Sequence, residues 1–116
     1  ASSAASDVYK RQVKKAANLV GIKKIIPSGT AIQNARTSFI GDHMNRDGYH
    51  LDLTIGRYTA ACTWFEALTH RNVTENPYSP EGIDPIHKKA AQMAAHNAIL
   101  YPDKVTELTE LKKIAD

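Results

Sequence analysis

The chain has 116 residues, of which 42% are hydrophobic and 23% are charged, and its 15 basic and 12 acidic residues leave a formal net charge of +3. This length allows one domain with a modest core and is small for a complete α/β enzyme. The composition is that of an ordinary globular chain, no apolar run is long enough to cross a membrane, and neither the charge nor any reading motif supports nucleic-acid binding.

The first twelve residues differ from the rest, because they open on a run of Ala and Ser and continue as Asp-Val-Tyr-Lys-Arg-Gln. They resemble the translated remnant of a sequencing adapter that recurs at the broken ends of metagenome-derived proteins. We therefore expect residues 1–12 to be non-native and to carry no evolved function. Residues 13–116 then form the native part, which we expect to begin in the middle of a larger protein.

The next segment predicts a helix followed by a buried strand. Apolar residues at positions 13, 16, 17 and 20 have the spacing of one helical face, and Gly21 is suited to end the helix. Residues 22–27 are a short β-branched apolar run that a proline stops, as in a buried strand. Helix and strand are half of a βαβ unit, and ligands of such sheets bind beyond the carboxyl ends of the strands. We therefore expect Thr30, Gln33 and Asn34 to line a substrate site, and backbone capping is the alternative role for these side chains.

The middle of the chain predicts one clear helix. Residues 30–38 predict a loop with one or two helical turns, and residues 39–49 predict an exposed connection. The clear helix is at 54–69, with an apolar stripe of Ile55, Tyr58, Ala61, Cys62, Trp64, Phe65 and Leu68. A place in this stripe makes Cys62 a small buried hydrophobe rather than a nucleophile. Asp52 or Thr54 is suited to cap the helix.

Asp84 and Pro85 predict the start of a further helix, as the N-cap and the first helical residue. Pro102 ends this helix, whose inner stripe is Ile86, Ala90, Met93, Asn97 and Leu100. Residues 103–114 predict a last amphipathic helix, carried by Val105, Leu108 and Leu111. Three histidines are most simply solvated or next to helix caps: His70, His87 and His96.

The most informative stretch is Asp47-Gly48-Tyr49-His50, a carboxylate and an imidazole three residues apart in a polar turn before the helix at 54–69. A serine nucleophile needs a base, and the base needs a partner that fixes its tautomer. Flexible Gly48 lets the turn fold Asp47 back towards Nδ1 of His50, which leaves Nε2 facing outward. The alternative is an Asp cap beside a surface His, because short D-x-x-H matches often arise by chance.

Other kinds of site find less support. A metal site would need four side chains within nine residues, Asp42, His43, Asp47 and His50. Their order matches no zinc signature, so we expect neither a metal nor another cofactor. Ser28 and Ser38 are the serines near the predicted strand end, and neither lies in a nucleophile elbow. We interpret Ser28 as a turn residue and Ser38 as a helix-end or loop residue.

Three segments in order carry a family resemblance: residues 25–38, residues 46–51 with the Asp-Gly-Tyr-His turn, and residues 56–69 with Cys-Thr-Trp-Phe-Glu. Over residues 13–73 the chain resembles the carboxyl-terminal part of a bacterial family in the SGNH/GDSL hydrolase superfamily, the domain-of-unknown-function family 4886. The resemblance implies an α/β fold: the carboxyl-terminal fragment of a flavodoxin-like three-layer sandwich. As it stands this fragment would be mostly helical, with one buried strand and three to four helices.

The resemblance also implies a serine-dependent ester hydrolase, in which His50 is the general base and Asp47 orients it. The serine nucleophile and the Gly and Asn that hold the oxyanion belong to segments without a counterpart in this chain. We therefore expect the chain alone to be inactive and the parent protein to act on a small-molecule or carbohydrate ester.

A non-catalytic helical binding or interaction module is the alternative. Three or four helices can bury a small core made of Tyr58, Cys62, Phe65, Ile86, Met93 and Leu100. Such a module predicts a cooperatively melting monomer. An unpaired strand at 22–27 predicts instead a broad melt with exposed apolar surface.

Overall fold

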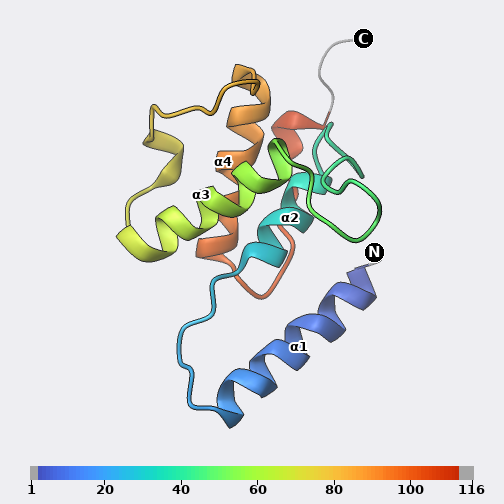
Figure 1. Ribbon diagram of the computed structural model, residues 1–116, viewed down its shortest axis with the longest axis vertical. Coiled ribbons are helices and arrows are strands. Elements are labelled where there is room, and N and C mark those ends of the chain that lie inside the picture. The colour runs from blue at the N-terminus through green and yellow to red at the C-terminus, as the bar shows by residue number, and fades with distance from the viewer. Residues whose placement is uncertain (1–2, 113–116) are drawn as a thin grey trace.

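The computed structural model describes residues 3–112, and within that range it contains four helices and two single 3₁₀ turns. In chain order these are α1 (Ser3–Leu19), α2 (Ser28–Arg36), α3 (Ile55–Thr69), η1 (Val73–Glu75), α4 (Pro85–Leu100) and η2 (Thr109–Leu111). Figure 1 shows α2, α3 and α4 packed together, with α1 apart from them beyond a long connection. No helix in the described range has both the length and the apolar character that crossing a membrane requires.

α1 is longer than the helix predicted at 13–20, because it runs through most of the first twelve residues. Half of those twelve residues are Ala, Lys, Arg or Gln, which are good helix formers. The helix ends as predicted: Gly21 has a φ of 77°, and the Ile22 amide donates to the Ala17 carbonyl at 2.9 Å. From residue 8 onward Ala17 is the one buried residue of α1, and Lys14 forms an ion pair with Asp103.

The sequence predicts a buried strand over residues 22–27, but this segment, which we call the connector, has no regular secondary structure and pairs with no strand among the described residues. Among residues 3–112 there is no sheet, and the one β-bridge is an isolated contact between Asn45 and Leu51. A strand requires a neighbour that takes its backbone hydrogen bonds, and no described segment does so here. The described part is therefore a mostly helical body, and the flavodoxin-like sandwich is not seen in it.

α2 is a complete helix where the sequence predicts a loop with one or two turns. The Thr30 hydroxyl donates to the Pro102 carbonyl at 2.7 Å, and the Asn34 amide nitrogen donates to the Ala94 carbonyl at 3.1 Å. These partners lie 72 and 60 residues further along the chain. The helix is thus stabilised by tertiary bonds that no local pattern reveals.

α3 forms where predicted, and Asp52 caps it by accepting the Gly56 amide at 3.3 Å and the Thr54 amide at 2.9 Å. Its buried face is rotated from the predicted stripe, because Trp64 and Leu68 are 54% and 59% exposed. Three polar residues are buried instead: Thr59, Thr63 and Glu66. The two threonine hydroxyls donate to helix carbonyls four residues earlier, so their burial leaves no unpaired donor.

α4 begins at Asp84 and Pro85 as predicted, with Asp84 accepting the His87 amide at 2.9 Å. Five of its alanines have no exposed surface: Ala90, Ala91, Ala94, Ala95 and Ala98. Small side chains allow close approach of neighbouring helices, and both α2 and α3 pack against α4. α4 is therefore buried on more than one face, whereas the sequence predicts a single buried stripe. Leu100, which belongs to that predicted stripe, is 53% exposed.

The last predicted helix, at 103–114, is not formed in the described residues of that segment, where η2 is the only helical turn. Residues 113–114 lie outside the described range. Two backbone amides of the segment donate to α2 and the residue after it: the Asn34 side-chain oxygen accepts the Thr106 amide at 2.7 Å, and the Thr37 hydroxyl accepts the Leu108 amide at 2.9 Å. These bonds bury Leu108 and Leu111 without a helix.

The core gathers side chains from the helices and from two connections. Of the residues proposed for a helical core, Tyr58 and Cys62 are buried, whereas three pack half-buried against it: Phe65, Ile86 and Met93. The connection at 39–49 is not wholly exposed as predicted, because it contributes Ile40 and Met44, which are 3% and 1% exposed. These two residues hold the loop that carries Asp47 and His50 against the helices.

Gly56→Ala is expected to destabilise the protein by about 1–3 kcal/mol, because overpacking forces backbone shifts. A Cβ at Gly56 would lie 2.8 Å from the carbonyl oxygen of Met44 and 3.2 Å from Cβ of Asp52. The measurement is the free energy of unfolding in urea. Gly29→Ala is the matched control, because a Cβ there meets nothing within 4 Å and Ala is the better helix former. Equal stability of the two variants would contradict the expectation.

Candidate functional site

The residues Asp47 and His50 lie in a tight turn between Asn45 and Leu51. The Asn45 side-chain oxygen accepts the Gly48 amide at 2.7 Å, and the turn is closed by the Arg46 amide, which donates to the His50 carbonyl at 2.8 Å. Gly48 has a φ of 80°, a left-handed conformation that favours glycine. The turn is thus determined by its own residues, as the sequence suggests.

Within this turn the Asp47 carboxylate binds both the ring and the backbone of His50. Its Oδ2 lies 2.8 Å from Nδ1 of His50, and its Oδ1 accepts the amides of Tyr49 and His50 at 2.8 and 2.7 Å. The hydrogen bond from the His50 ring, followed by the two amide bonds, lowers the pKa of Asp47 to about 2. Asp47 is therefore a carboxylate at neutral pH, in the form that holds an imidazole with its proton on Nδ1.

The other ring nitrogen of His50 is available. Among residues 3–112 nothing forms a hydrogen bond with Nε2, and the side chains of His50 and Asp47 are 54% and 53% exposed. The Tyr49 ring meets the His50 ring edge-on with centroids 4.8 Å apart, and Tyr49 is 87% exposed. An oriented imidazole with a free outward Nε2 can accept a proton from a hydroxyl brought to it.

A second Asp-x-x-His pair in the same chain has a similar contact between the carboxylate and the ring. At the start of α4, Oδ1 of Asp84 lies 2.7 Å from Nδ1 of His87 and also accepts the His87 amide, the bond that contributes most to lowering the Asp84 pKa. This pair is a helix cap, and it confirms the prediction that His87 lies next to a cap. Pair geometry alone therefore does not distinguish a catalytic dyad from a cap.

The three predicted substrate-binding residues all lie on α2, but they differ in access. Thr30 and Asn34 are 2% and 0% exposed, and their side chains bind Pro102, Ala94 and the amide of Thr106. Gln33 is half-buried, and its side-chain oxygen accepts from the Arg36 guanidinium at 2.9 Å. Gln33 is thus the most accessible of the three.

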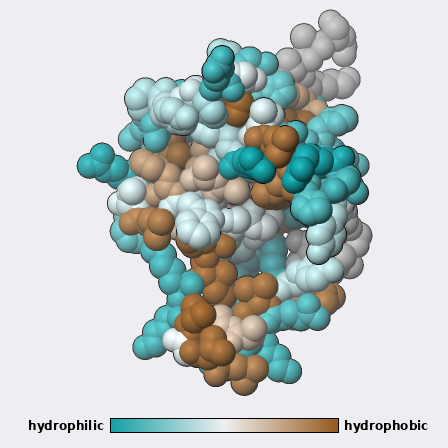
Figure 2. Space-filling view, in the orientation of Figure 1, coloured by the Kyte–Doolittle hydropathy of each residue, from teal (hydrophilic) through white to brown (hydrophobic). Residues whose placement is uncertain are grey.

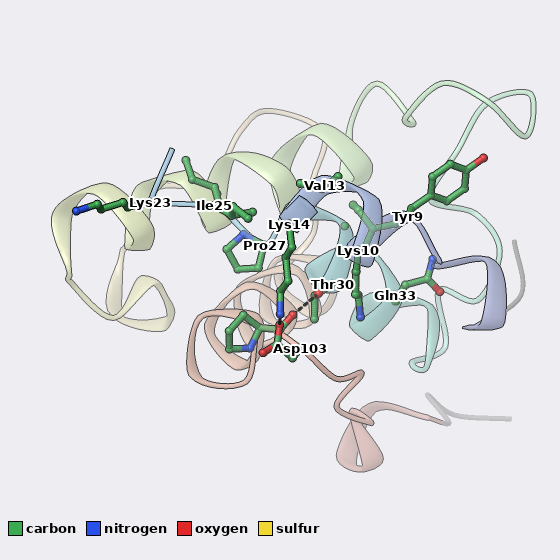
Figure 3. Close-up of a pocket in the computed structure, with 14 residues that line it drawn as sticks. Tyr9, Lys10, Val13, Lys14, Lys23, Ile25, Pro27, Thr30, Gln33 and Asp103 are labelled. Carbon is green, nitrogen blue, oxygen red and sulfur yellow. Dashed lines mark hydrogen bonds and ion pairs between the residues drawn. The ribbon is translucent and has the colours of Figure 1, made fainter. Parts of the chain in front are cut away.

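Thr30 and Gln33 line an open pocket of about 590 Å³ between α1, the connector and α2 (Figure 3). Its walls combine apolar side chains of the connector with lysines of α1. Asp47 and His50 are not among its lining residues, and no hydrogen bond in the described range joins them to α2. The structure therefore does not bring the predicted base and the predicted substrate-binding residues into one pocket.

A carboxylate–imidazole pair that the sequence does not reveal joins α3 to α4, with the carboxylate buried and the imidazole partly exposed. Both oxygens of Glu66 lie near Nδ1 of His96, at 3.0 and 2.9 Å, and Oε1 also accepts the Val73 amide at 2.8 Å. The Glu66 and His96 side chains are 7% and 26% exposed, so His96 is partly solvated and its Nδ1 is bound to Glu66. The available signal was an acidic residue beside the apolar stripe of α3, but its partner lies 30 residues away.

The remaining candidates have structural partners. In the described range no three His, Cys, Asp or Glu side chains are grouped to hold a metal ion, and a hydrogen bond from Arg36 lowers the pKa of Asp42. Burial raises the pKa of the Cys62 thiol to about 11, so this residue is protonated and inert at neutral pH. Ser28 is the first residue of α2 rather than a turn residue, and Ser38 is the predicted helix-end residue, donating to a carbonyl at 2.6 Å.

The comparisons with known proteins identify the family. The model of the family described as Domain of unknown function (DUF4886) matches residues 5–98. One similar solved structure is the crystal structure of a DUF4886 family protein from Bacteroides uniformis ATCC 8492 at 1.50 Å resolution. Its sequence is 93% identical to this chain, and the TM-score of the two structures is 0.89. The match covers 92% of this chain and 41% of the solved chain. This chain thus spans less than half of that relative, and no curated protein matches it significantly. Because the family model matches most of its length, the chain belongs to the DUF4886 family.

Proposed function

We propose that this chain is the carboxyl-terminal part of a serine-dependent ester hydrolase of the SGNH type, to which it contributes the Asp47–His50 half of the catalytic triad. The observation that carries the proposal is the 2.8 Å contact between Oδ2 of Asp47 and Nδ1 of His50, with Nε2 left available. The order of the segments around this turn, which resembles that superfamily, supports a catalytic assignment for this pair over the capping pair at Asp84 and His87.

In the proposed reaction, His50 is the general base and Asp47 its positioning residue. Nε2 of His50 takes the proton of a serine hydroxyl from another part of the parent as the serine oxygen attacks the ester carbonyl. The imidazolium then gives this proton to the departing alcohol, and water releases the acid by the same steps. The Asp47 carboxylate stabilises the imidazolium in both steps, and its low pKa keeps it ionised.

The fold proposal follows from the same resemblance. We propose that residues 13–116 belong to a flavodoxin-like α/β sandwich whose sheet lies largely in the rest of the parent, and that residues 1–12 are non-native. The family match starts at residue 5, inside this proposed non-native segment. A small-molecule or carbohydrate ester is the proposed substrate, and Gln33 is the best placed of Thr30, Gln33 and Asn34 to contact it.

The test is an assay of a full-length family chain that contains this sequence. It is expected to hydrolyse a short-chain p-nitrophenyl ester and to be labelled on a serine by a fluorophosphonate, whereas the 116-residue chain alone is expected to do neither. Absence of both turnover and labelling in the full-length chain would overturn the hydrolase proposal. Turnover by the 116-residue chain would overturn the proposal that it supplies only half of the triad.

A helical binding module is the second candidate, and the α2–α3–α4 core favours it. The buried alanines of α4 form a continuous interface with both neighbouring helices, as expected of a unit that is stable by itself. This reading predicts a sharp, cooperative thermal transition of the 116-residue chain, together with a full-length chain that no serine probe labels. A broad melt would contradict it.

A further inference from the structure

The turn that carries Asp47 and His50 also presents an exposed aromatic ring beside the base. Tyr49 is 87% exposed, and its ring meets the His50 ring edge-on with centroids 4.8 Å apart. Among the described residues nothing forms a hydrogen bond with its hydroxyl. The Tyr49 ring therefore packs against little besides the imidazole, and its flat apolar surface is open to a ligand.

Arg46 lies opposite His50 across the same turn. Its amide donates to the His50 carbonyl at 2.8 Å, and its Nε donates to the Leu51 carbonyl at 2.9 Å. The second bond holds the guanidinium in place, and within residues 3–112 nothing binds its two Nη groups. After the hydrogen bonds from the His50 ring and the backbone amides, the charge of Arg46 also lowers the pKa of Asp47. A fixed guanidinium with free donors therefore lies close to the Asp47–His50 pair.

The carboxylates of this loop are already engaged. Both oxygens of Asp47 accept bonds from within the turn, and Oδ2 of Asp52 accepts the amides of Thr54 and Gly56. Figure 2 shows mostly hydrophilic side chains on the right of the view, over this loop, whereas apolar side chains gather at the lower end, over the end of α1 and the connector. A ligand of the turn is therefore polar, and the charged group that it meets with free hydrogen-bonding capacity is a guanidinium.

The proposed reaction decides which part of an ester meets these two side chains. Nε2 of His50 gives its proton to the departing alcohol, so the alcohol part of the ester lies against the His50 turn. The acyl carbonyl lies instead at the oxyanion donors, which the resemblance assigns to segments without a counterpart in this chain. Tyr49 and Arg46 are therefore placed to contact the alcohol rather than the acyl group.

We propose that Tyr49 and Arg46 bind the alcohol part of the ester and select a sugar that carries a carboxylate, a uronic acid. This inference rests on the proposed hydrolase function and narrows its substrate class. A pyranose ring can lay its apolar C–H face on an aromatic ring, and a guanidinium binds a carboxylate through two parallel hydrogen bonds. The exposed ring and the fixed guanidinium of one turn match both features, whereas a neutral alcohol would leave the Nη groups of Arg46 without a charged partner.

Two matched substrates test this selection in a full-length family chain: a monoacetylated methyl glucuronoside and the corresponding methyl glucoside, which differ only in the carboxylate. We expect kcat/KM to be about 5-fold higher for the glucuronoside, the effect of one exposed charge pair with good geometry. Arg46→Ala is expected to abolish this preference through KM, and about 1 M sodium chloride to reduce it by screening. Equal kcat/KM of the unmodified chain on the two sugars would overturn the proposal and leave the hydrolase proposal intact.

Variants separate substrate contact from a structural role of the turn. If Arg46 only closed the turn, Arg46→Ala would lower kcat/KM on both sugars equally, and that result would overturn the proposal. Tyr49→Ala is expected to lower kcat/KM on both sugars about 5-fold, and Tyr49→Phe, which keeps the ring, to restore most of it. Full activity of Tyr49→Ala on both sugars would contradict contact with the ring. Arg71→Ala and Tyr78→Ala, at exposed residues remote from the turn in sequence, are the matched controls, with the preference expected to be unchanged.

A binding measurement gives an answer that does not depend on turnover. Calorimetric titration of the full-length chain with methyl glucuronoside, the alcohol product, is expected to show binding that Arg46→Ala weakens about 5-fold. No detectable binding, or binding that Arg46→Ala leaves unchanged, would overturn the proposal even in a chain that hydrolyses no ester. Failure of the hydrolase proposal is the absence of turnover on every ester, so the two failures are distinguishable.

Discussion

His50→Ala in a full-length family chain is expected to lower kcat for ester hydrolysis by about 10⁴-fold, because the serine loses the base that removes its proton. The Asp47–His50 turn is built from its own backbone bonds, so the substitution leaves the loop closed at Asn45 and Leu51. The measurement is kcat and KM on a short-chain ester. A largely unchanged KM with a collapsed kcat is the expected pattern.

His87→Ala is the matched control, because its ring lies 2.7 Å from an aspartate three residues earlier, as the ring of His50 does at 2.8 Å. It is expected to leave kcat within about twofold, since a cap contributes only to stability. Asp47→Asn is expected to reduce kcat by a similar order to His50→Ala, because an amide no longer stabilises the imidazolium. A rate unaffected by His50→Ala would remove His50 from the mechanism.

Glu66→Ala is expected to lower the free energy of unfolding by about 2–4 kcal/mol. The carboxylate accepts the buried Val73 amide at 2.8 Å and binds His96 at 2.9 Å, so its removal leaves two donors without a partner. The lower part of the range allows for the partial exposure of His96, which water can solvate. Urea unfolding of the 116-residue chain, followed by circular dichroism, measures the change.

Glu75→Ala is the control for this substitution, because Glu75 lies in η1 close to Val73 in the chain but is exposed. A surface change of this kind is expected to alter stability by less than about 0.5 kcal/mol. Glu66→Gln retains an acceptor for the Val73 amide and is expected to fall between the two. If Glu66→Ala is no more destabilising than Glu75→Ala, the pair does not fasten α3 to α4.

Features that depend on residues within one or two turns of each other follow from the sequence. Asp84 and Pro85 start α4, Gly21 ends α1, and Asp47 reaches His50 around a left-handed Gly48, all as predicted. The end of α1 rests on the left-handed backbone of Gly21, and the other two rest on an aspartate that meets a backbone amide and a ring three residues away. Such contacts form independently of the rest of the chain, so a local sequence pattern is sufficient to predict them.

Features that depend on residues far apart in the chain do not follow from the sequence. α2 is lengthened by bonds to Ala94 and Pro102, and the segment after α4 donates its amides to Asn34 and Thr37 instead of forming a helix. The connector has the composition of a strand, yet it is unpaired because no described segment supplies a neighbour. The composition of a segment indicates that it can form a strand. Whether a second strand lies beside it is decided only by the packed structure.

The sequence by itself determined the positions of α3 and α4, their caps, the Asp47–His50 turn and the resemblance that led to the family. Tertiary structure alone decided which face of each helix is buried, that Glu66 binds His96, and that the pocket beside α2 excludes His50. The physical reason is the range of the interactions: capping and turn bonds close within a few residues, whereas burial and long-range pairing exist only after the helices have packed.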